Sequence, residues 1–458
     1  MPRRYCSIAM LLIAVVAFVT VLTHSLRAGS PVIAATAPPA SALPRIQGTA
    51  SGPSFTGPGS CAAVACHGAV RPVAGSRILQ TEYTTWIAQD RHARAAEVLS
   101  NTVSVRMAKI LGLGAAHTAP KCLACHSLDA PEARQARTFV SEGVSCEACH
   151  GPASAWLGPH TTRGWTHAQS VQLGMYDTKN LVKRTEQCLT CHLGTAEKFV
   201  DHEMIAAGHP DLVFDLEAFS AAMPRHWRGS TPEDPFAAVR SFSVGQIVHL
   251  RSSLERLARR VKGPVWPEYG ELECFACHHS LTRPEDSWRQ SAGYENRRPG
   301  NPPLNTSRWT TARHVLAAFD PRAAEELKEV VTSLAREASR LRANEDQVVS
   351  LVSRAKPILD AAAARAATSK PDAVLAGRLL RAIASDAESI AAAGERAAEQ
   401  AAMAMETLSR TLAESNEGGP IRAAFDELFQ QFQSPSSYDP RRFVAQVRKI
   451  EAVLGPAR

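Results

Sequence analysis

Ten of the eleven cysteines in this chain of 458 residues form five pairs, and a histidine directly follows each pair. Four pairs have two residues between the cysteines, and the first pair has four. In chain order they are motif 1, CAAVACH (61–67); motif 2, CLACH (122–126); motif 3, CEACH (146–150); motif 4, CLTCH (188–192); and motif 5, CFACH (274–278). The fold must therefore accommodate the same short motif at five places in the chain.

The sequence Cys-x-x-Cys-His is the attachment site of c-type haem. Two thiols on one short turn can bond both vinyl groups of one macrocycle, and the next histidine then becomes the proximal ligand of the iron. The pattern predicts about five covalent haem c groups. The predicted attachment cysteines are Cys61, Cys66, Cys122, Cys125, Cys146, Cys149, Cys188, Cys191, Cys274 and Cys277. The predicted proximal ligands are His67, His126, His150, His192 and His278.

Other uses of paired cysteines account less well for this pattern. Zinc sites need no histidine directly after each pair, and structural disulfides would not share one histidine-terminated motif. Thioredoxin-like motifs occur singly within a βαβ pattern, which is absent from this sequence. Motif 1 has two extra residues that can bulge outward, and a disulfide between Cys61 and Cys66 remains an alternative there.

The remaining histidines decide the function, because each haem iron has a sixth coordination position on the face opposite the proximal ligand. A second histidine there, the distal ligand, gives an electron carrier, whereas an open position can bind a substrate. After the five proximal ligands and His24 are set aside, ten histidines remain. These are enough to fill every sixth position.

Two segments resemble the cytochrome c554 family of multihaem cytochromes. TTWIAQDRHARA (84–95) resembles its Trp-x-x-x-x-x-His segment, and EGVSCEACHGPASAWLGPH (142–160) resembles its third haem segment. The resemblance covers roughly residues 58–200. It implies a mostly helical fold with closely stacked haem pairs. It also implies that His92 and His160 are distal ligands of haems held by motifs other than the nearest ones.

The chain differs from cytochrome c554 in motif 1, in its fifth motif and in its long C-terminal region. It looks more like the larger cytochrome c-552/4-type proteins, which share AAGHPDLVFDLEAF (206–219), PRHW (224–227) and FACHHS (275–280). These stretches make His209 and His226 distal candidates. His314, near the start of an apolar-periodic helix, is a further candidate, while His167, His202 and His249 are expected to be structural.

The N-terminus reads as an export signal, because a basic start precedes the apolar run IAMLLIAVVAFVTVL (8–22). An uncleaved membrane anchor is the alternative, and the expected location in both cases is the periplasm. The predicted domains are a signal peptide or anchor (1–28), a Pro/Ala-rich linker (29–58), a pentahaem cytochrome c domain (59–300) and a C-terminal helical domain (308–458).

The region after residue 308 contains no cysteine and has helical apolar spacing, as in Leu327, Val330, Val331 and Leu334. We expect Pro357 to interrupt this pattern and a second long helix to run from Pro371 to about residue 415. The expected fold class is mostly α: a multihaem domain with little regular sheet, followed by a helical bundle or long hairpin. This region could also form a homo-oligomer surface.

The formal net charge of +7 does not indicate a nucleic-acid partner, because charges of both signs alternate and no long basic block occurs. We therefore expect electron transfer between redox partner proteins, through haems that mostly have two histidine ligands. The alternative is an enzyme that acts on a small nitrogen or sulfur compound at one five-coordinate haem. Ammonia-forming nitrite reductases are such enzymes, but their Cys-x-x-Cys-Lys motif does not occur in this chain. No catalytic residue is predicted.

Overall fold

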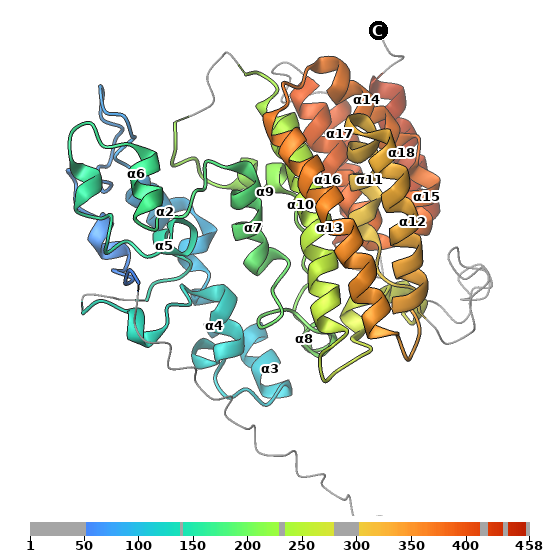
Figure 1. The fold of residues 1–458 in the computed structure, drawn as a ribbon, viewed down its shortest axis with the longest axis horizontal. Helices are drawn as coiled ribbons and strands as arrows, with labels where there is room; N and C mark the ends of the chain where they lie inside the picture. Colours follow the sequence, from blue (N-terminus) through green and yellow to red (C-terminus); the bar gives the residue numbers. More distant parts are fainter. Residues whose placement is uncertain are drawn as a thin grey trace, which may run out of the picture. The chain divides into compact units, whose positions relative to one another are not determined.

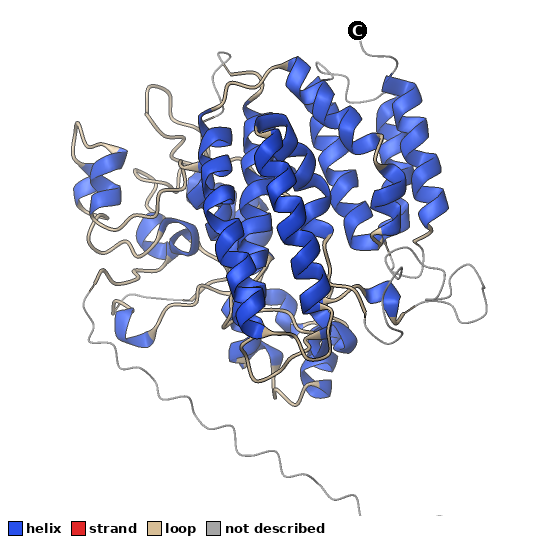
Figure 2. Cartoon of the chain, turned by 45° about the vertical axis from the view of Figure 1, so that its right-hand side comes forward, coloured by secondary structure: helices blue, strands red, loops and turns tan. Residues whose placement is uncertain are grey.

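The computed structural model describes residues 52–137, 141–228, 234–278, 302–412, 420–433 and 438–454. Helices and loops make up these residues (Figure 2), and the predicted mostly helical class is confirmed. The described residues contain no strand, and only two isolated bridges join Phe55 to Gln135 and Leu272 to Leu304. The predicted signal segment and most of the linker lie outside the described residues. None of the helices that are described has the length and apolarity needed to cross a membrane.

Short helices and loops form the part of the chain that carries motifs 1 to 4. The α-helices are α2 (Glu82–Gln89), α3 (Thr102–Ile110), α4 (Pro120–His126), α5 (Cys146–His150), α6 (His167–Gln172), α7 (Leu181–His192), α8 (His202–Ala207) and α9 (Leu216–Ala222). The 3-10 turns are η1 (Pro58–Cys61), η2 (Arg91–Arg94), η3 (Glu97–Ser100), η4 (Ala116–Thr118), η5 (Glu132–Arg134) and η6 (Pro159–Thr161).

This N-terminal part has little apolar core of its own. One small cluster of buried side chains is found there among the described residues, formed by Leu99, Ala108 and Ala116. A segment this poor in core side chains is unusual unless a large apolar group contributes to its packing. The observation agrees with the covalent haem groups that the cysteine motifs predict.

The central helix α10 (Ala237–Arg260) joins this part to the C-terminal bundle. It packs against α7 and α9 on one side and against bundle helices on the other (Figure 1). The bundle contains α11 (Ser307–Phe319), α12 (Pro321–Ala338), α13 (Glu345–Thr368), α14 (Ala373–Ala384), α15 (Ala387–Ala392), α16 (Glu395–Leu412), α17 (Pro420–Phe429), η10 (Gln430–Phe432) and α18 (Pro440–Leu454). Two further turns, η7 (Tyr269–Glu271) and η8 (Cys274–Ala276), lie between α10 and the bundle.

One continuous apolar core runs from α7 through α10 into the bundle, and it includes the fully buried side chains of Phe242 and Leu334. Helix α10 belongs to the predicted haem domain by its place in the sequence, but its buried side chains lie in the same core as those of the bundle. The predicted domain boundary between residues 300 and 308 stays a prediction.

Two details of the bundle differ from the sequence-based expectation. Pro357 does not interrupt the pattern, because α13 continues through it and buries Ala355 and Leu359 on either side. Burial of this face offsets the cost of a proline inside a helix, which is about 3 kcal/mol. The expected long helix after Pro371 is three helices, and Gly394, with φ of 100°, precedes the last of them.

Candidate haem-binding site

The motifs place their cysteines and histidine on single turns. Helices α4, α5 and α7 each end at the histidine of motif 2, 3 or 4, and motif 5 begins in η8. In motif 1 the backbone N–H groups of Cys66, His67 and Gly68 all donate to the Ala63 carbonyl oxygen. Only Ala62 separates this turn from Cys61. All ten motif cysteines are free thiols.

Four of the five motif histidines face a second histidine ring. The paired rings and their centroid distances are His67 and His160 at 6.2 Å, His126 and His209 at 6.4 Å, His192 and His92 at 6.1 Å, and His278 and His202 at 6.3 Å. Two imidazoles that bind opposite faces of one metal at about 2 Å have centroids roughly 6 Å apart. The four pairs therefore fit the axial ligand set of a six-coordinate haem.

The hydrogen bonds of these rings leave the same nitrogen available for iron. In five of the paired rings Nδ1 lies near an oxygen: Glu82 Oε2 for His67 (3.0 Å), Asp90 Oδ1 for His92 (3.0 Å), Ala95 O for His126 (2.8 Å), Leu157 O for His160 (2.5 Å) and Pro210 O for His209 (2.7 Å). An Nδ1–H group that donates to such an oxygen fixes the tautomer, and Nε2 is then the metal-binding atom.

His167 and His314 show the opposite arrangement. His167 Nε2 lies 2.8 Å from Asp177 Oδ1, and His314 Nε2 lies 2.9 Å from Asp386 Oδ2. His314 was expected to be a distal ligand, but within the described part of the chain it faces no motif histidine. Asp386 of the bundle contacts both His314 and Arg313. These contacts hold the His314 ring within the bundle.

The electrostatics of the site keep two proximal candidates uncharged. Burial lowers the pKa of His150 and of His192 to about 4, so both imidazoles are neutral at pH 7. Burial is the largest effect on the pKa of Glu82 and would raise it, but the hydrogen bonds and the charge of His67 together lower that pKa. The pKa of Asp90 is lowered in the same way by its hydrogen bonds with His92 and the nearby histidine charges. Neutral imidazoles are the form that binds metal.

The motifs lie next to one another in a definite order. The Cys146 side chain lowers the pKa of the Cys61 thiol to about 7, which places motif 3 beside motif 1. In the same way Cys125 lowers the pKa of Cys191 to about 5, which places motif 2 beside motif 4. Motif 3 also lies beside motif 4, because the Gln187 side chain next to Cys188 donates to the Ala148 carbonyl oxygen between Cys146 and Cys149.

Glu147, between the cysteines of motif 3, connects motifs 1 and 3. Its side chain is only 2% exposed. Its carboxylate accepts backbone N–H bonds from Thr56 (2.9 Å), Gly57 (2.7 Å) and Ala153 (2.7 Å). Thr56 and Gly57 lead directly into η1 and Cys61. The carboxylate therefore fixes the start of motif 1 against the turn of motif 3.

Helix α8 presents a paired histidine at each end. The Asp201 side chain accepts from Met204 N and caps the helix at His202. At the other end Gly208, with φ of 114°, stops the helix, and His209 N donates to the Met204 carbonyl oxygen. One helix of six residues therefore serves motif 5 with His202 and motif 2 with His209.

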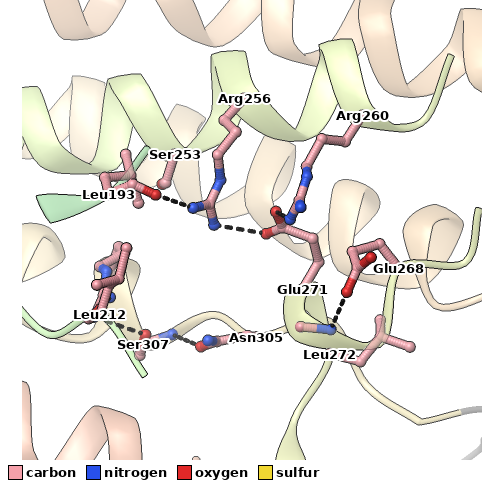
Figure 3. A network of polar contacts seen from close by, with 12 residues as sticks. Leu193, Leu212, Ser253, Arg256, Arg260, Glu268, Glu271, Leu272, Asn305 and Ser307 are labelled. Carbon is pink, nitrogen blue, oxygen red and sulfur yellow. Dashed lines mark hydrogen bonds and ion pairs between the residues drawn. The ribbon is translucent and has the colours of Figure 1, made fainter. Parts of the chain in front are cut away.

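Glu268 and Glu271 position motif 5 against this helix. The Glu268 carboxylate accepts from the backbone N–H groups of His202 and Gly270, both at 2.9 Å. Figure 3 shows the guanidinium groups of Arg256 and Arg260 on α10 directed at Glu271, at 2.9 and 2.5 Å. Burial would raise the pKa of Glu271, but these arginines lower it, and the charged pair anchors the turn before Cys274.

His202 was expected to be structural, but its ring faces a motif histidine. The structure brings its ring to His278, and Tyr269 packs against it at a centroid distance of 5.7 Å. A signal was present in DHEMIAAGHP (201–210), because an Asp cap and a Gly stop frame a helix with a histidine at either end. The cap and the stop predict the helix, but they do not predict which motif each histidine faces.

The histidine of motif 3 differs from the other four. Within the described residues no second histidine ring lies opposite His150 as one does in the four pairs. The charge of the neighbouring His226 also lowers the pKa of His150, although burial has the larger effect. The Nδ1 atom of His226 is 3.4 Å from the Pro224 carbonyl oxygen, a longer contact than those in the paired rings.

Comparison with known proteins agrees with the motifs. The family model described as "Cytochrome c554 and c-prime" matches residues 61–151, which contain motifs 1 to 3 and His92. No curated protein and no solved structure matches the chain. The resemblance to this family is thereby confirmed over the matched residues. The match supports a c-type cytochrome with covalently bound haem, and motifs 4 and 5 lie beyond the matched residues.

Proposed function

We propose that this protein is a periplasmic electron carrier that holds five haem c groups, one on each motif. The observation that carries the proposal is the set of four imidazole pairs with centroids 6.1 to 6.4 Å apart. A haem with two histidine ligands supplies one-electron transfer and has no free position for a substrate. The paired histidines hold the ligand geometry, and Nδ1 contacts restrain the rotation of five of the eight rings.

The contacts between motifs support a continuous path through the protein. Motif 1 lies beside motif 3, motif 3 beside motif 4, and motif 4 beside motif 2. Helix α8 then connects motif 2 with motif 5 through His209 and His202. The order 1–3–4–2–5 places motifs 1 and 5 at the two ends. We infer that redox partner proteins exchange electrons near these two motifs.

An enzyme at an open haem is the second candidate function. Arg225, His226 and His279 are the polar groups that the sequence offers for such a site, and His279 lies outside the described residues. The feature that most favours this candidate is His150, because no histidine ring lies opposite it within the described residues. The four imidazole pairs favour electron transfer for the rest of the site.

Peptide mapping tests the haem at motif 1. After proteolysis of the matured protein, the peptide that contains Cys61 to His67 should carry the mass of one haem. Replacing Cys61 and Cys66 with alanine should lower the haem content from five to four per chain. Detection of the wild-type peptide as a disulfide without haem would contradict the proposal for motif 1.

Glu82→Gln should raise the midpoint potential of one haem by roughly 60 mV, which is a tenfold change in a one-electron equilibrium. The carboxylate at 3.0 Å from His67 Nδ1 makes this imidazole a stronger donor and stabilises ferric iron, and the amide does so less. A spectroelectrochemical titration measures the change. The matched control is Asp177→Asn, because Asp177 binds His167 through Nε2, and this variant should leave all potentials unchanged. Equal potentials in wild type and Glu82→Gln would remove His67 from the ligand set.

A further inference from the structure

A polar cavity lies between α10, η7 and the start of α11, where the bundle meets the cysteine motifs. Figure 3 shows part of it, with Arg256 of α10 on one side and Asn305, just before α11, on the other. Leu193, which directly follows the histidine of motif 4, lines the cavity, and so does Glu271, three residues before motif 5. A group bound here would therefore lie beside two of the predicted haem attachment motifs.

Arg308 of α11 lines this cavity without a carboxylate partner. Among the described residues it forms no ion pair, and its guanidinium donates to uncharged oxygens: Leu212 O at 2.6 Å, and Ser307 Oγ and Gln400 Oε1 at 3.3 Å. Burial lowers the pKa of Arg308 to about 10, so the side chain is still charged at pH 7. A buried positive charge is costly unless a negative group lies against it.

Two side chains of α16 add donors that lack an acceptor. Arg396 is 5% exposed and Gln400 is fully buried, and they lie one turn apart on the helix. Gln400 Oε1 accepts from Arg308, but no hydrogen-bond acceptor for Gln400 Nε2 or Arg396 Nη2 is found among the residues that the structure describes. Because native proteins rarely leave buried donors unsatisfied, the group missing from this place is an acceptor.

The carboxylates that line the cavity are already engaged. Asp211 forms an ion pair with Arg396 Nε, and Glu271 forms ion pairs with Arg256 and Arg260. Neither carboxylate forms an ion pair with Arg308 in the described part of the chain. The acceptor for Arg308 and its neighbours must therefore come from a bound group.

We propose that this cavity binds a carboxylate group, held by Arg308, Arg396 and Gln400. An ionised carboxylate offers only acceptors, and guanidinium groups bind it through parallel N–H donors. The group can be a propionate of the haem at motif 5, which rests on the proposed haem attachment, or a small free carboxylate. We expect the propionate, because Arg396 Nη1 also donates to the carbonyl oxygens of Gly270 and Leu272, both at 3.2 Å, in the turn before motif 5.

Arg308→Gln in the matured full chain tests the propionate. The variant should favour the oxidised form of one haem by about tenfold in a spectroelectrochemical titration, because a nearby positive charge stabilises the reduced haem. It should also shift the propionate bending band in the resonance Raman spectrum, which reports hydrogen bonds to the propionates. Both changes should vanish in a background in which Cys274 and Cys277 are alanine. The matched control is Arg378→Gln, an exposed arginine of α14, which should change neither signal.

A free carboxylate is tested by the unfolding temperature in potassium acetate against potassium chloride at equal ionic strength. If the cavity binds the free ion, acetate should raise Tm in wild type and Arg378→Gln but not in Arg308→Gln. Gln400→Glu serves if Arg308→Gln fails to mature, because its own carboxylate should displace the bound group and give the same Raman shift or loss of the acetate effect.

The result that would overturn the inference is an unchanged Raman spectrum in both variants together with no acetate effect in wild type. The electron-carrier proposal would then stand, because it depends on the count of low-spin haems, which neither variant should alter. A wild-type protein without haem at motif 5 would instead contradict the proposed function at that motif, and the acetate comparison would still decide whether the cavity binds a carboxylate.

Discussion

His202→Ala is expected to convert one low-spin haem of the protein to the high-spin state. The His202 ring lies 6.3 Å from that of His278, and no other histidine in the described residues pairs with His278. Loss of the imidazole leaves the iron at motif 5 with one protein ligand, and a weak-field ligand or an open position gives high-spin iron. Low-temperature EPR, quantified against total haem, should show the loss of one of the four low-spin haems that the imidazole pairs predict.

The matched control is His314→Ala, which removes the histidine that the sequence favoured for this role. Because His314 Nε2 is engaged by Asp386 in the bundle, its loss should leave the low-spin signals unchanged. A change of spin state in His314→Ala with none in His202→Ala would reverse the assignment. Haem content should stay the same in both variants, since neither residue belongs to an attachment motif.

Glu147→Ala should lower the free energy of unfolding by about 3 kcal/mol or more, because it removes the acceptor of buried backbone N–H groups. The N–H groups of Thr56, Gly57 and Ala153 donate to this carboxylate, and the residue is 2% exposed. The loss should also release the segment before Cys61, so that less haem is attached at motif 1. Denaturant unfolding and haem content of purified protein measure the two effects.

Glu132→Ala is the control for this variant, because Glu132 is an exposed residue in η5. It should change the free energy of unfolding by less than about 0.5 kcal/mol. If Glu147→Ala were as stable as this control and carried a full complement of haem, the carboxylate would not be the link between motifs 1 and 3.

The cysteine motifs made the composition of the site predictable, whereas the three-dimensional pairing was not. Each motif is local, so the sequence alone gives the thiols and the proximal histidine. A distal histidine comes from a distant segment: His160 faces motif 1, and His92 faces motif 4. Such pairs depend on how the turns pack, which no local pattern records.

His202 and His314 illustrate this limit. His314 lies in a clear apolar-periodic helix, which drew attention to it, yet an aspartate 72 residues later engages its Nε2. His202 looked like an ordinary helix-start residue, yet Glu268 holds its backbone beside the turn that leads to motif 5. In the bundle the apolar spacing predicted helical structure, but it did not reveal the breaks between α14, α15 and α16. Helix α13, which packs against α10, also continues through Pro357, where an interruption was expected.

The most direct test of the account is a count of the low-spin ferric haems in the matured wild-type protein, by low-temperature EPR with total haem measured in the same sample. The four imidazole pairs predict four low-spin haems per chain, and none of the described residues forms such a pair with the histidine of motif 3. Fewer than four low-spin haems would mean that the paired rings are not axial ligands, and would contradict the proposal that this protein is an electron carrier.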